Sequence, residues 1–175
     1  MPLARILESV AQYKAGHVVV TGGEPMIAPG VAELTARLRE TGLHITIETA
    51  GTVFHALACD LMSISPKLGN STPEGPWAAR HERLRINPDA LRRLMALCDY
   101  QLKFVVARPE DVSEEILPLV ESLAAGPRKV ILMPEGVAPA VLRERGAWIV
   151  ELCKRHGFRF SPRLHVDLWG DRRGV

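Results

Sequence analysis

The chain has 175 residues, enough for one domain that buries about 70% of the surface of its unfolded form, so a packed core is expected. Its 22 lysines and arginines nearly balance 20 aspartates and glutamates, and a net charge of +2 gives no strong field for nucleic acid or an anionic membrane. No apolar run approaches the ~18 residues that span a bilayer, and the first residues do not resemble a secretory signal. We therefore expect a cytoplasmic protein that acts on a small molecule.

Strand-like and helical patterns alternate along the chain. Apolar, often β-branched runs predict strands at 18–21, 45–48, 61–65, 101–106, 129–133 and, more weakly, 158–161. Apolar positions three and four apart predict helices at 3–13, 31–40, 88–97, 112–123 and 139–155. Such alternation predicts parallel strands joined by right-handed crossovers, and so an α/β sheet or barrel in a single domain over 1–175.

The stretch 17–25 is the most informative part of the chain, because a β-branched strand passes directly into two glycines, an acid and a proline. Gly22 and Gly23 can take positive φ and bring their own N–H and C=O groups against a ligand. Pro25 ends the strand ladder, since it has no N–H to donate. We call Thr21, Gly22, Gly23 and Glu24 the TGGE turn. From residues 17–25 alone, a tight strand-to-helix turn that binds no ligand is an equal alternative.

Similar turns follow the other predicted strands. They are the loop 48–52, the SPK turn (Ser65, Pro66 and Lys67) and the MPEG turn (Met133, Pro134, Glu135 and Gly136), and the predicted strand 101–106 adds Lys103 to the same polar set. The carboxyl ends of parallel strands share one rim, where ligands bind in barrels and open α/β sheets. We therefore expect these turns to gather around one nucleoside-sized hollow. Lys67 would supply a cation, Ser65 a hydroxyl, and Gly136 close backbone approach.

In order and spacing, these turns resemble the radical S-adenosylmethionine superfamily and, within it, the 7-carboxy-7-deazaguanine synthase family. The stretch 20–25 is similar to that family's motif for the amino group of S-adenosylmethionine, and 60–67 to its serine-proline-lysine contact. The stretches 102–106 and 132–136 resemble its last two barrel strands, and 163–175 its tail. The resemblance covers nearly the whole chain.

The resemblance implies an α/β fold of the radical S-adenosylmethionine type, an incomplete TIM-like (β/α) barrel that here lacks its first strand and cluster loop. It implies a carbon–nitrogen lyase of queuosine biosynthesis. In that family a 4Fe-4S cluster reduces S-adenosylmethionine, and a 5′-deoxyadenosyl radical takes hydrogen from 6-carboxy-5,6,7,8-tetrahydropterin. A Mg²⁺-assisted ring contraction then expels ammonia. A homodimer and an electron donor such as flavodoxin or ferredoxin are also implied.

By position, the resemblance assigns ten residues to S-adenosylmethionine: Gly22, Gly23, Glu24, Ser65, Pro66, Lys67, Met133, Pro134, Glu135 and Gly136. It assigns Thr21, His165 and the terminal carboxylate of Val175 to the pterin substrate. No residue is assigned to a metal, and no catalytic residue is named. If 165–167 is extended, His165 and Asp167 point the same way. A surface pair is the equal alternative.

The chain departs from the family in its cysteines. The family ligates its cluster through three cysteines in a C-x3-C-x2-C loop, whereas Cys59, Cys98 and Cys153 are 39 and 55 positions apart. We expect three buried thiols that do not converge, and a chain that corresponds to a C-terminal portion, unable by itself to bind the cluster or turn over. Such a portion would expose a strand edge along 18–21.

Two rival interpretations remain. A non-catalytic barrel fragment could retain part of the S-adenosylmethionine or pterin surface, and calorimetry would test this, since a true fragment should bind weakly or not at all. A phosphate-handling barrel enzyme using Lys67 and Lys103 ranks low, because neither common phosphate loop is present. The basic stretch 80–93 could meet an anionic partner, but a solvated helix face is the more common role of such a run.

Overall fold

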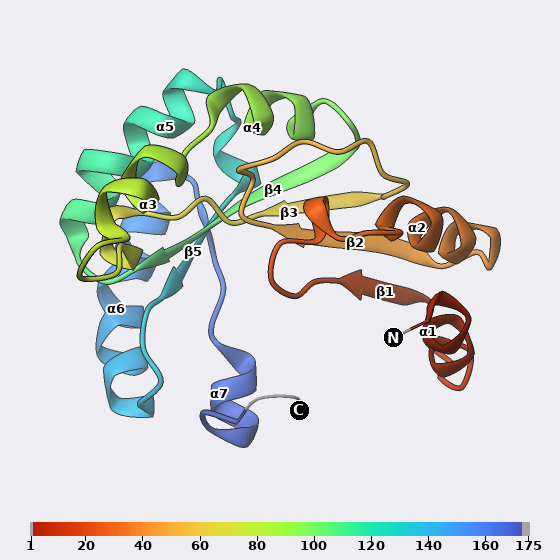
Figure 1. The fold of residues 1–175 in the computed structure, drawn as a ribbon. Helices are drawn as coiled ribbons and strands as arrows, with labels where there is room; N and C mark the ends of the chain where they lie inside the picture. The colour runs from red at the N-terminus through yellow and green to blue at the C-terminus, as the bar shows by residue number, and fades with distance from the viewer. Residues whose placement is uncertain (1, 173–175) are drawn as a thin grey trace. The chain divides into compact units, whose positions relative to one another are not determined.

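Residues 2–172 are described in the computed structural model of the chain (Figure 1). The chain divides into two compact units. The first unit comprises Met1–Ile64 and Asn87–Tyr100, and the second comprises Ser65–Ile86 and Gln101–Val175. The single domain expected over 1–175 stays a prediction.

The first unit is built on three parallel strands that follow one another in chain order: β1 (His17–Val20), β2 (His44–Thr49) and β3 (Leu61–Ile64). Its helices are α1 (Leu3–Val10), η1 (Pro25–Ile27), α2 (Val31–Glu40) and α4 (Pro88–Met95). In β2, polar and apolar residues alternate and every second side chain is buried. Ile45 and Ile47 of β2, Met62 of β3 and Leu94 of α4 are fully buried in the core.

The second unit also has three parallel strands: β4 (Asp99–Val106, from Gln101 onward), β5 (Val130–Pro134) and β6 (Arg159–Phe160). Its helices are η2 (Gly69–Ser71), α3 (Ala78–Leu84), η3 (Asp111–Ile116), α5 (Leu117–Ser122), η4 (Pro127–Lys129), α6 (Pro139–His156) and α7 (Leu164–Trp169). Phe104 and Leu132 of the strands, Ile116 of η3 and Ile149 of α6 are fully buried. Over the described residues, 2–172, the structure has no helix long and apolar enough to cross a membrane.

All six predicted strands are present, and α2 has the predicted bounds. The predicted helix 112–123 is instead a π-helical turn, η3, followed by α5. Pro118 explains the change, because it lacks an N–H and its ring crowds the preceding turn. The turn widens before the α-helix begins at Leu117. Gly42 and Gly157 have φ of +78° and +70°, as helix-ending glycines do.

Among the described residues, two short α-helices were not predicted, α3 and α7. α3 lies inside the segment 66–88, which the sequence analysis treated as irregular, although a helix face was considered for its basic part. α7 replaces the extended stretch considered for 165–167, and Val166 is its buried residue. Residues two apart on a helix are about 200° apart around the axis, so the common direction expected for His165 and Asp167 is wrong.

β1 has an exposed edge. Within the described residues it pairs only with β2, and the side chain of Val19 is 54% exposed. This agrees with the edge expected along 18–21. A strand edge with exposed β-branched residues offers unpaired N–H and C=O groups to another chain.

Gly51 lies two residues after the end of β2, and two physical reasons favour glycine there. Its φ is +75°, and an added Cβ would lie 2.5 Å from Leu91 Cδ2 and 2.7 Å from Ile64 Cγ2. Both neighbours belong to the core of the first unit. A side chain at 51 would therefore meet strain and overlap together.

We expect Gly51→Ala to lower the free energy of unfolding by about 2–4 kcal/mol, through left-handed strain and overpacking. Gly42→Ala is the matched control, since φ is +78° there but nothing lies within 4 Å of an added Cβ. It should lose only about 1 kcal/mol. Urea unfolding of both variants measures the difference, and equal losses would contradict the packing argument.

Candidate functional site

The TGGE turn lies at the carboxyl end of β1 in the first unit. Gly22 and Gly23 have φ of +107° and +50°, and an added Cβ at either position would meet nothing within 4 Å. The requirement for glycine is therefore conformational rather than steric. Thr21 is exposed and its hydroxyl donates to Glu48 Oε2 over 3.4 Å. The turn presents backbone N–H and C=O groups rather than a packed side chain.

Glu24 ties the TGGE turn to the loop after β2. Its Oε1 accepts the Thr49 hydroxyl at 2.7 Å and the Met26 N–H at 3.1 Å, while its Oε2 accepts the Ala50 N–H at 3.0 Å. Both carboxylate oxygens thus have protein partners, and one of them caps η1. The carboxylate holds the turn, and a ligand at this place would meet the backbone of the glycines.

The SPK turn lies in the second unit and lines a hollow of about 270 Å³. The lining residues are Ser65, Pro66, Lys67, Leu68, Asn70, Ser71, Val105 and Glu135. The hollow joins the SPK turn to Glu135 of the MPEG turn, although 68 positions separate Lys67 from Glu135 in the sequence. A cation, two hydroxyls, an amide and a carboxylate therefore surround one small space, which suits a polar ligand.

Two arginines hold the MPEG turn. Arg145 of α6 donates from Nη1 to the Glu135 carbonyl at 2.6 Å and pairs with the Glu135 carboxylate. Arg163 donates from Nη1 to the Gly136 carbonyl at 3.0 Å, and Gly136 has a φ of +131°. Neither arginine was singled out from the sequence. Both bind backbone carbonyls that a glycine-containing turn leaves outside the strand ladder, and such pairing has no sequence signature.

A buried carboxylate fixes one wall of the hollow. Asp111 of η3 is 1% exposed, and its Oδ2 accepts Asn70 Nδ2 at 2.9 Å and the Ala107 N–H at 2.8 Å. Its Oδ1 accepts from Arg108 Nε at 3.1 Å. Asn70 also donates to the Val105 carbonyl at 3.1 Å. Sequence reasoning missed Asn70 and Asp111, because each is one polar residue in a helical or turn pattern.

Burial alone would raise the pKa of Asp111, but hydrogen bonds from Ala107, Asn70 and Arg108 outweigh it and lower that pKa below its ordinary value of 3.8. The ionised form is therefore the one that the folded protein holds. It keeps Asn70 oriented at the hollow at neutral pH.

The remaining predicted residues lie elsewhere in the two units. His165 is exposed on α7, and Met133 and Pro134 close β5. Val175 lies outside the described residues. The TGGE turn belongs to the first unit and the SPK and MPEG turns to the second, so a single hollow that includes all three stays a prediction.

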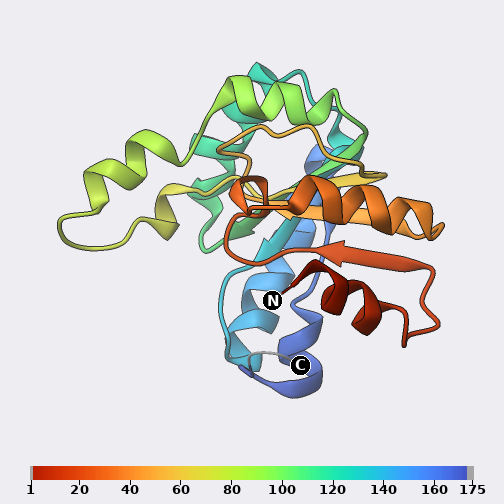
Figure 2. The ribbon, with the colours of Figure 1, turned by 45° about the vertical axis from the view of Figure 1, so that its right-hand side comes forward.

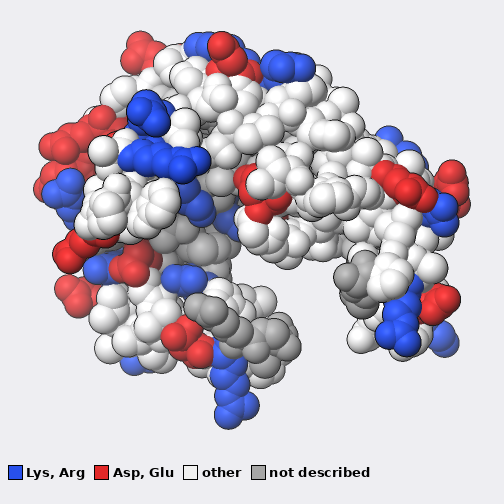
Figure 3. All heavy atoms as spheres, viewed as in Figure 1, with Lys and Arg blue, Asp and Glu red and all other residues white. Residues whose placement is uncertain are grey.

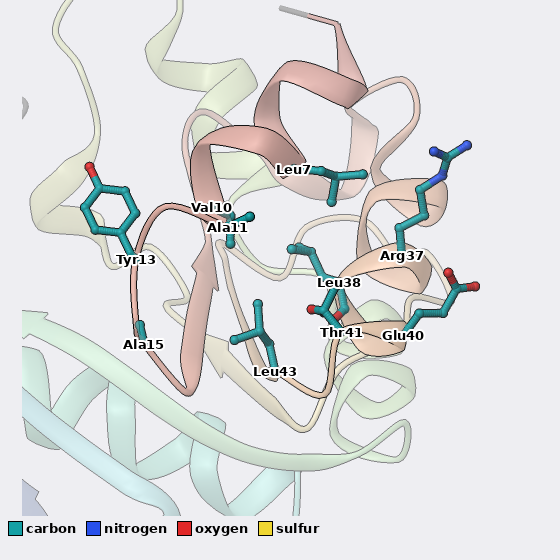
Figure 4. A pocket seen from close by; sticks show the side chains of 10 residues that line it. All are labelled: Leu7, Val10, Ala11, Tyr13, Ala15, Arg37, Leu38, Glu40, Thr41 and Leu43. Atoms are coloured by element: carbon teal, nitrogen blue, oxygen red, sulfur yellow. The ribbon is translucent and has the colours of Figure 1, made fainter.

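A larger cavity of the first unit lies away from these turns. It has a volume of about 520 Å³ and lies between α1 and α2, where Leu7 and Val10 point toward Leu38 and Leu43 (Figure 4). Ala15 and Leu43 precede β1 and β2, so the cavity lies at the amino ends of these strands, opposite the TGGE turn. Ligands of parallel α/β sheets bind at the carboxyl ends, which favours the turns over this cavity.

Two relatives of this chain have the same name. No family model matches the chain. The 7-carboxy-7-deazaguanine synthase of Halobacterium salinarum is 42% identical over 190 residues, covering 98% of this chain and 72% of that protein. The protein of the same name from Rhodopirellula baltica is 37% identical over 175 residues, covering 97% and 68%.

The chain belongs to the 7-carboxy-7-deazaguanine synthase family.

Solved structures agree with this family. The crystal structure of QueE from Escherichia coli superposes with a TM-score of 0.61 at 28% identity, covering 93% of this chain and 64% of that one. Streptococcus suis SuiB, solved bound to S-adenosylmethionine, gives a TM-score of 0.62 at 14% identity, which shows the fold alone. The predicted α/β fold of the radical S-adenosylmethionine type is confirmed.

The cysteines of this family member differ from the expectation in one respect. Cys59 and Cys98 lie together in the first unit, where burial and the Cys98 thiol raise the pKa of Cys59. No sequence pattern predicted this pair, and the expectation of three buried thiols is wrong for Cys98, which is half-buried. Cys153 belongs to the second unit and donates to the Arg159 carbonyl at 3.3 Å. Over 2–172, the structure brings together no group of three or more His, Cys, Asp or Glu that could hold a metal.

The basic stretch 80–93 is divided between α3 of the second unit and α4 of the first. Arg80 lies over Trp77 at 5.8 Å, and Arg93 over Phe54 at 3.8 Å. Arg85 pairs with Glu82 and Glu115, and Arg92 with Asp89 at 3.5 Å. On the left of Figure 3, basic and acidic side chains are interspersed over the second unit. These local partners favour the solvated helix face over a patch for an anionic partner.

We expect Glu24→Gln to lower the free energy of unfolding by about 1–3 kcal/mol, because the new amide group would face N–H and O–H donors where the carboxylate accepts. Glu33→Gln is the control, since Glu33 forms only an exposed pair with Arg37 and should change the value by less than about 0.5 kcal/mol. Chemical denaturation measures both. Equal effects would show that Glu24 does not hold the turn.

Asp111 predicts a pH dependence of stability. Because its pKa is lowered on folding, its contribution is present above its ordinary pKa of 3.8 and is lost as the pH falls through the lower folded value. Asp111→Asn should cost roughly 2 kcal/mol at pH 7 and flatten the fall in stability between about pH 5 and pH 2. Asp89→Asn, at a side chain 93% exposed, is the control. An unchanged pH profile for Asp111→Asn would contradict the assignment.

Proposed function

We propose that this chain carries S-adenosylmethionine-binding surface of a radical enzyme that converts 6-carboxy-5,6,7,8-tetrahydropterin to 7-carboxy-7-deazaguanine with loss of ammonia. Relatives with that product name cover 97–98% of the chain at 37–42% identity. The observation that carries the proposal is the hollow shared by the SPK turn and Glu135, because two turns that the family resemblance assigns to one ligand line the same space.

The residues at the hollow fit part of S-adenosylmethionine. That ligand has a carboxylate, a ribose and an adenine, which call for a cation, for donors and acceptors to hydroxyls, and for backbone groups. Lys67 offers an ammonium group and Ser65 a hydroxyl at the hollow, while the Gly136 backbone stands next to Glu135 in the MPEG turn. When bound, S-adenosylmethionine would supply the group that removes hydrogen from the substrate. The chain's own residues bind and orient it.

In this proposal the TGGE turn holds the amino group of S-adenosylmethionine through the backbone of Gly22 and Gly23, with Thr21 beside the substrate. Positive φ at both glycines and the open space around their Cα atoms support this role, because a ligand can approach the backbone closely there. Glu24 keeps that backbone in place through Thr49 and Ala50. His165 and the Val175 carboxylate remain proposed contacts to the pterin.

A 4Fe-4S cluster, Mg²⁺, a flavodoxin or ferredoxin donor, a homodimer, a cytoplasmic location and the lyase class belong to the proposal at the level of the family. The described residues do not fit the cluster, since they bring no three metal ligands together. We therefore derive no step through it. The chain spans 64% of E. coli QueE.

Equilibrium binding of S-adenosylmethionine tests the proposal. We expect saturable, weak binding to the chain, and Lys67→Met should raise Kd at least about tenfold, because it removes the cation opposite the ligand carboxylate. Lys154→Met is the matched control, since Lys154 pairs with Glu151 on α6 and does not line the hollow. Calorimetry measures all three proteins. No saturable binding to the wild-type chain, or equal binding by Lys67→Met, would contradict the proposal.

A further inference from the structure

The SPK turn begins the segment Ser65–Ile86, which belongs to the second unit and contains α3. In Figure 2 the yellow-green part that contains α3 projects to the left as an arm. Ser65 stands at the start of this segment, and Arg85 follows α3 at its end. The contacts between the two ends of the arm therefore determine how the SPK turn is held in place.

Arg85 joins them directly. Its Nη1 donates to the Lys67 carbonyl at 3.0 Å and to Glu115 Oε2 at 2.8 Å, and its Nε donates to Glu82 Oε2 at 2.7 Å. The Arg85 side chain is only 16% exposed. One guanidinium thus binds the backbone of the SPK turn, a carboxylate of its own arm and a carboxylate of η3.

Glu115 completes the contact from η3. Both of its carboxylate oxygens accept the Gly69 N–H, at 3.0 and 3.1 Å, and its side chain is 24% exposed. An added Cβ at Gly69 would lie 3.2 Å from Glu115 Oε1, so a glycine there permits the close approach. The backbone is therefore bound at 67 and again at 69 by two side chains that also bind each other.

Arg85 and Glu115 do not line the hollow proposed for the ligand. Ser65, Pro66 and Lys67 line that hollow, whereas Arg85 and Glu115 line a separate one of about 320 Å³, and Leu68 borders both. The pair thus binds the backbone of the turn without lining the space proposed for the ligand.

We propose that Arg85 and Glu115 are positioning residues that hold the SPK turn in the form that receives S-adenosylmethionine. The role of the turn in binding S-adenosylmethionine rests on the proposed function, whereas the restraint of the turn by Arg85 and Glu115 does not. The planar guanidinium binds several acceptors at fixed angles, which a lysine ammonium on a flexible chain does not reproduce. A half-buried pair in a network also differs from an exposed surface pair, which contributes little.

Hydrogen exchange tests the restraint without any ligand. In Arg85→Met, the peptide spanning 66–72 should exchange at least about tenfold faster, because the Gly69 N–H loses a fixed acceptor, while the core strand peptide 101–106 should keep its rate. Arg85→Lys should restore part of the protection, and Glu115→Gln should resemble Arg85→Met. Arg37→Met is the matched control, since Arg37 forms only an exposed pair with Glu33.

Calorimetry on the same proteins tests the cofactor. Arg85→Met should raise Kd for S-adenosylmethionine about tenfold with little change in melting temperature, and Arg37→Met should leave Kd unchanged. Unchanged exchange at 66–72 in Arg85→Met overturns the inference, as does faster exchange throughout the second unit, which shows a general loss of stability. Faster local exchange with an unchanged Kd overturns the positioning of the cofactor. If the wild-type chain binds no S-adenosylmethionine while exchange responds locally, the proposed function fails and the cofactor part of the inference fails with it.

Discussion

Carboxylates that accept backbone N–H groups hold the turns on which the candidate site depends. A strand that ends in a turn leaves N–H groups without ladder partners, and a buried N–H must find an acceptor. Glu24 accepts the N–H of Ala50, Asp111 that of Ala107, and Glu115 that of Gly69. Glu24 and Glu115 reach these N–H groups across 26 and 46 positions, so those two turns are held by tertiary contact, whereas Asp111 is four positions from Ala107 and makes its long-range contact to Asn70.

The carboxylates that hold the turns therefore differ from the groups proposed to contact a ligand. A carboxylate that accepts hydrogen bonds from the protein need not contact a ligand. The Glu24 carboxylate accepts from the Thr49 hydroxyl and the Met26 N–H. In our proposal a ligand meets the backbone of Gly22 and Gly23 in the first unit, and Ser65 and Lys67, which line the hollow in the second. Such groups suit a polar, flexible cofactor, because each contact is short and directional.

The three thiols, of which Cys59 and Cys153 are buried and Cys98 is half-buried, favour their neutral form. Burial raises the pKa of Cys59, Cys98 and Cys153, which favours the neutral thiol over the thiolate that a metal or an electrophile requires. The family resemblance implies cluster-ligating thiolates on one loop, whereas Cys59 and Cys98 meet by the packing of two separate stretches of the first unit. Their character is that of small apolar residues within a core.

Local pattern was enough to predict much of this protein. Alternation in 44–49 and the β-branched run at 18–20 predict the strands, and the glycines at 22, 23 and 136 permit the positive φ found there. The order of the turns along the chain also identified the family, because that order can be read directly from the sequence. The long-range partners could not be predicted from the sequence. Asn70 with Asp111, Arg85 with Glu115 and Cys59 with Cys98 lie 41, 30 and 39 positions apart. A hydrogen bond of this kind is decided by three-dimensional proximity, and a single arginine or aspartate in a helix leaves no periodic signal. The residue types therefore determined the strands and turns, and only the packed chain decided which carboxylate holds which turn.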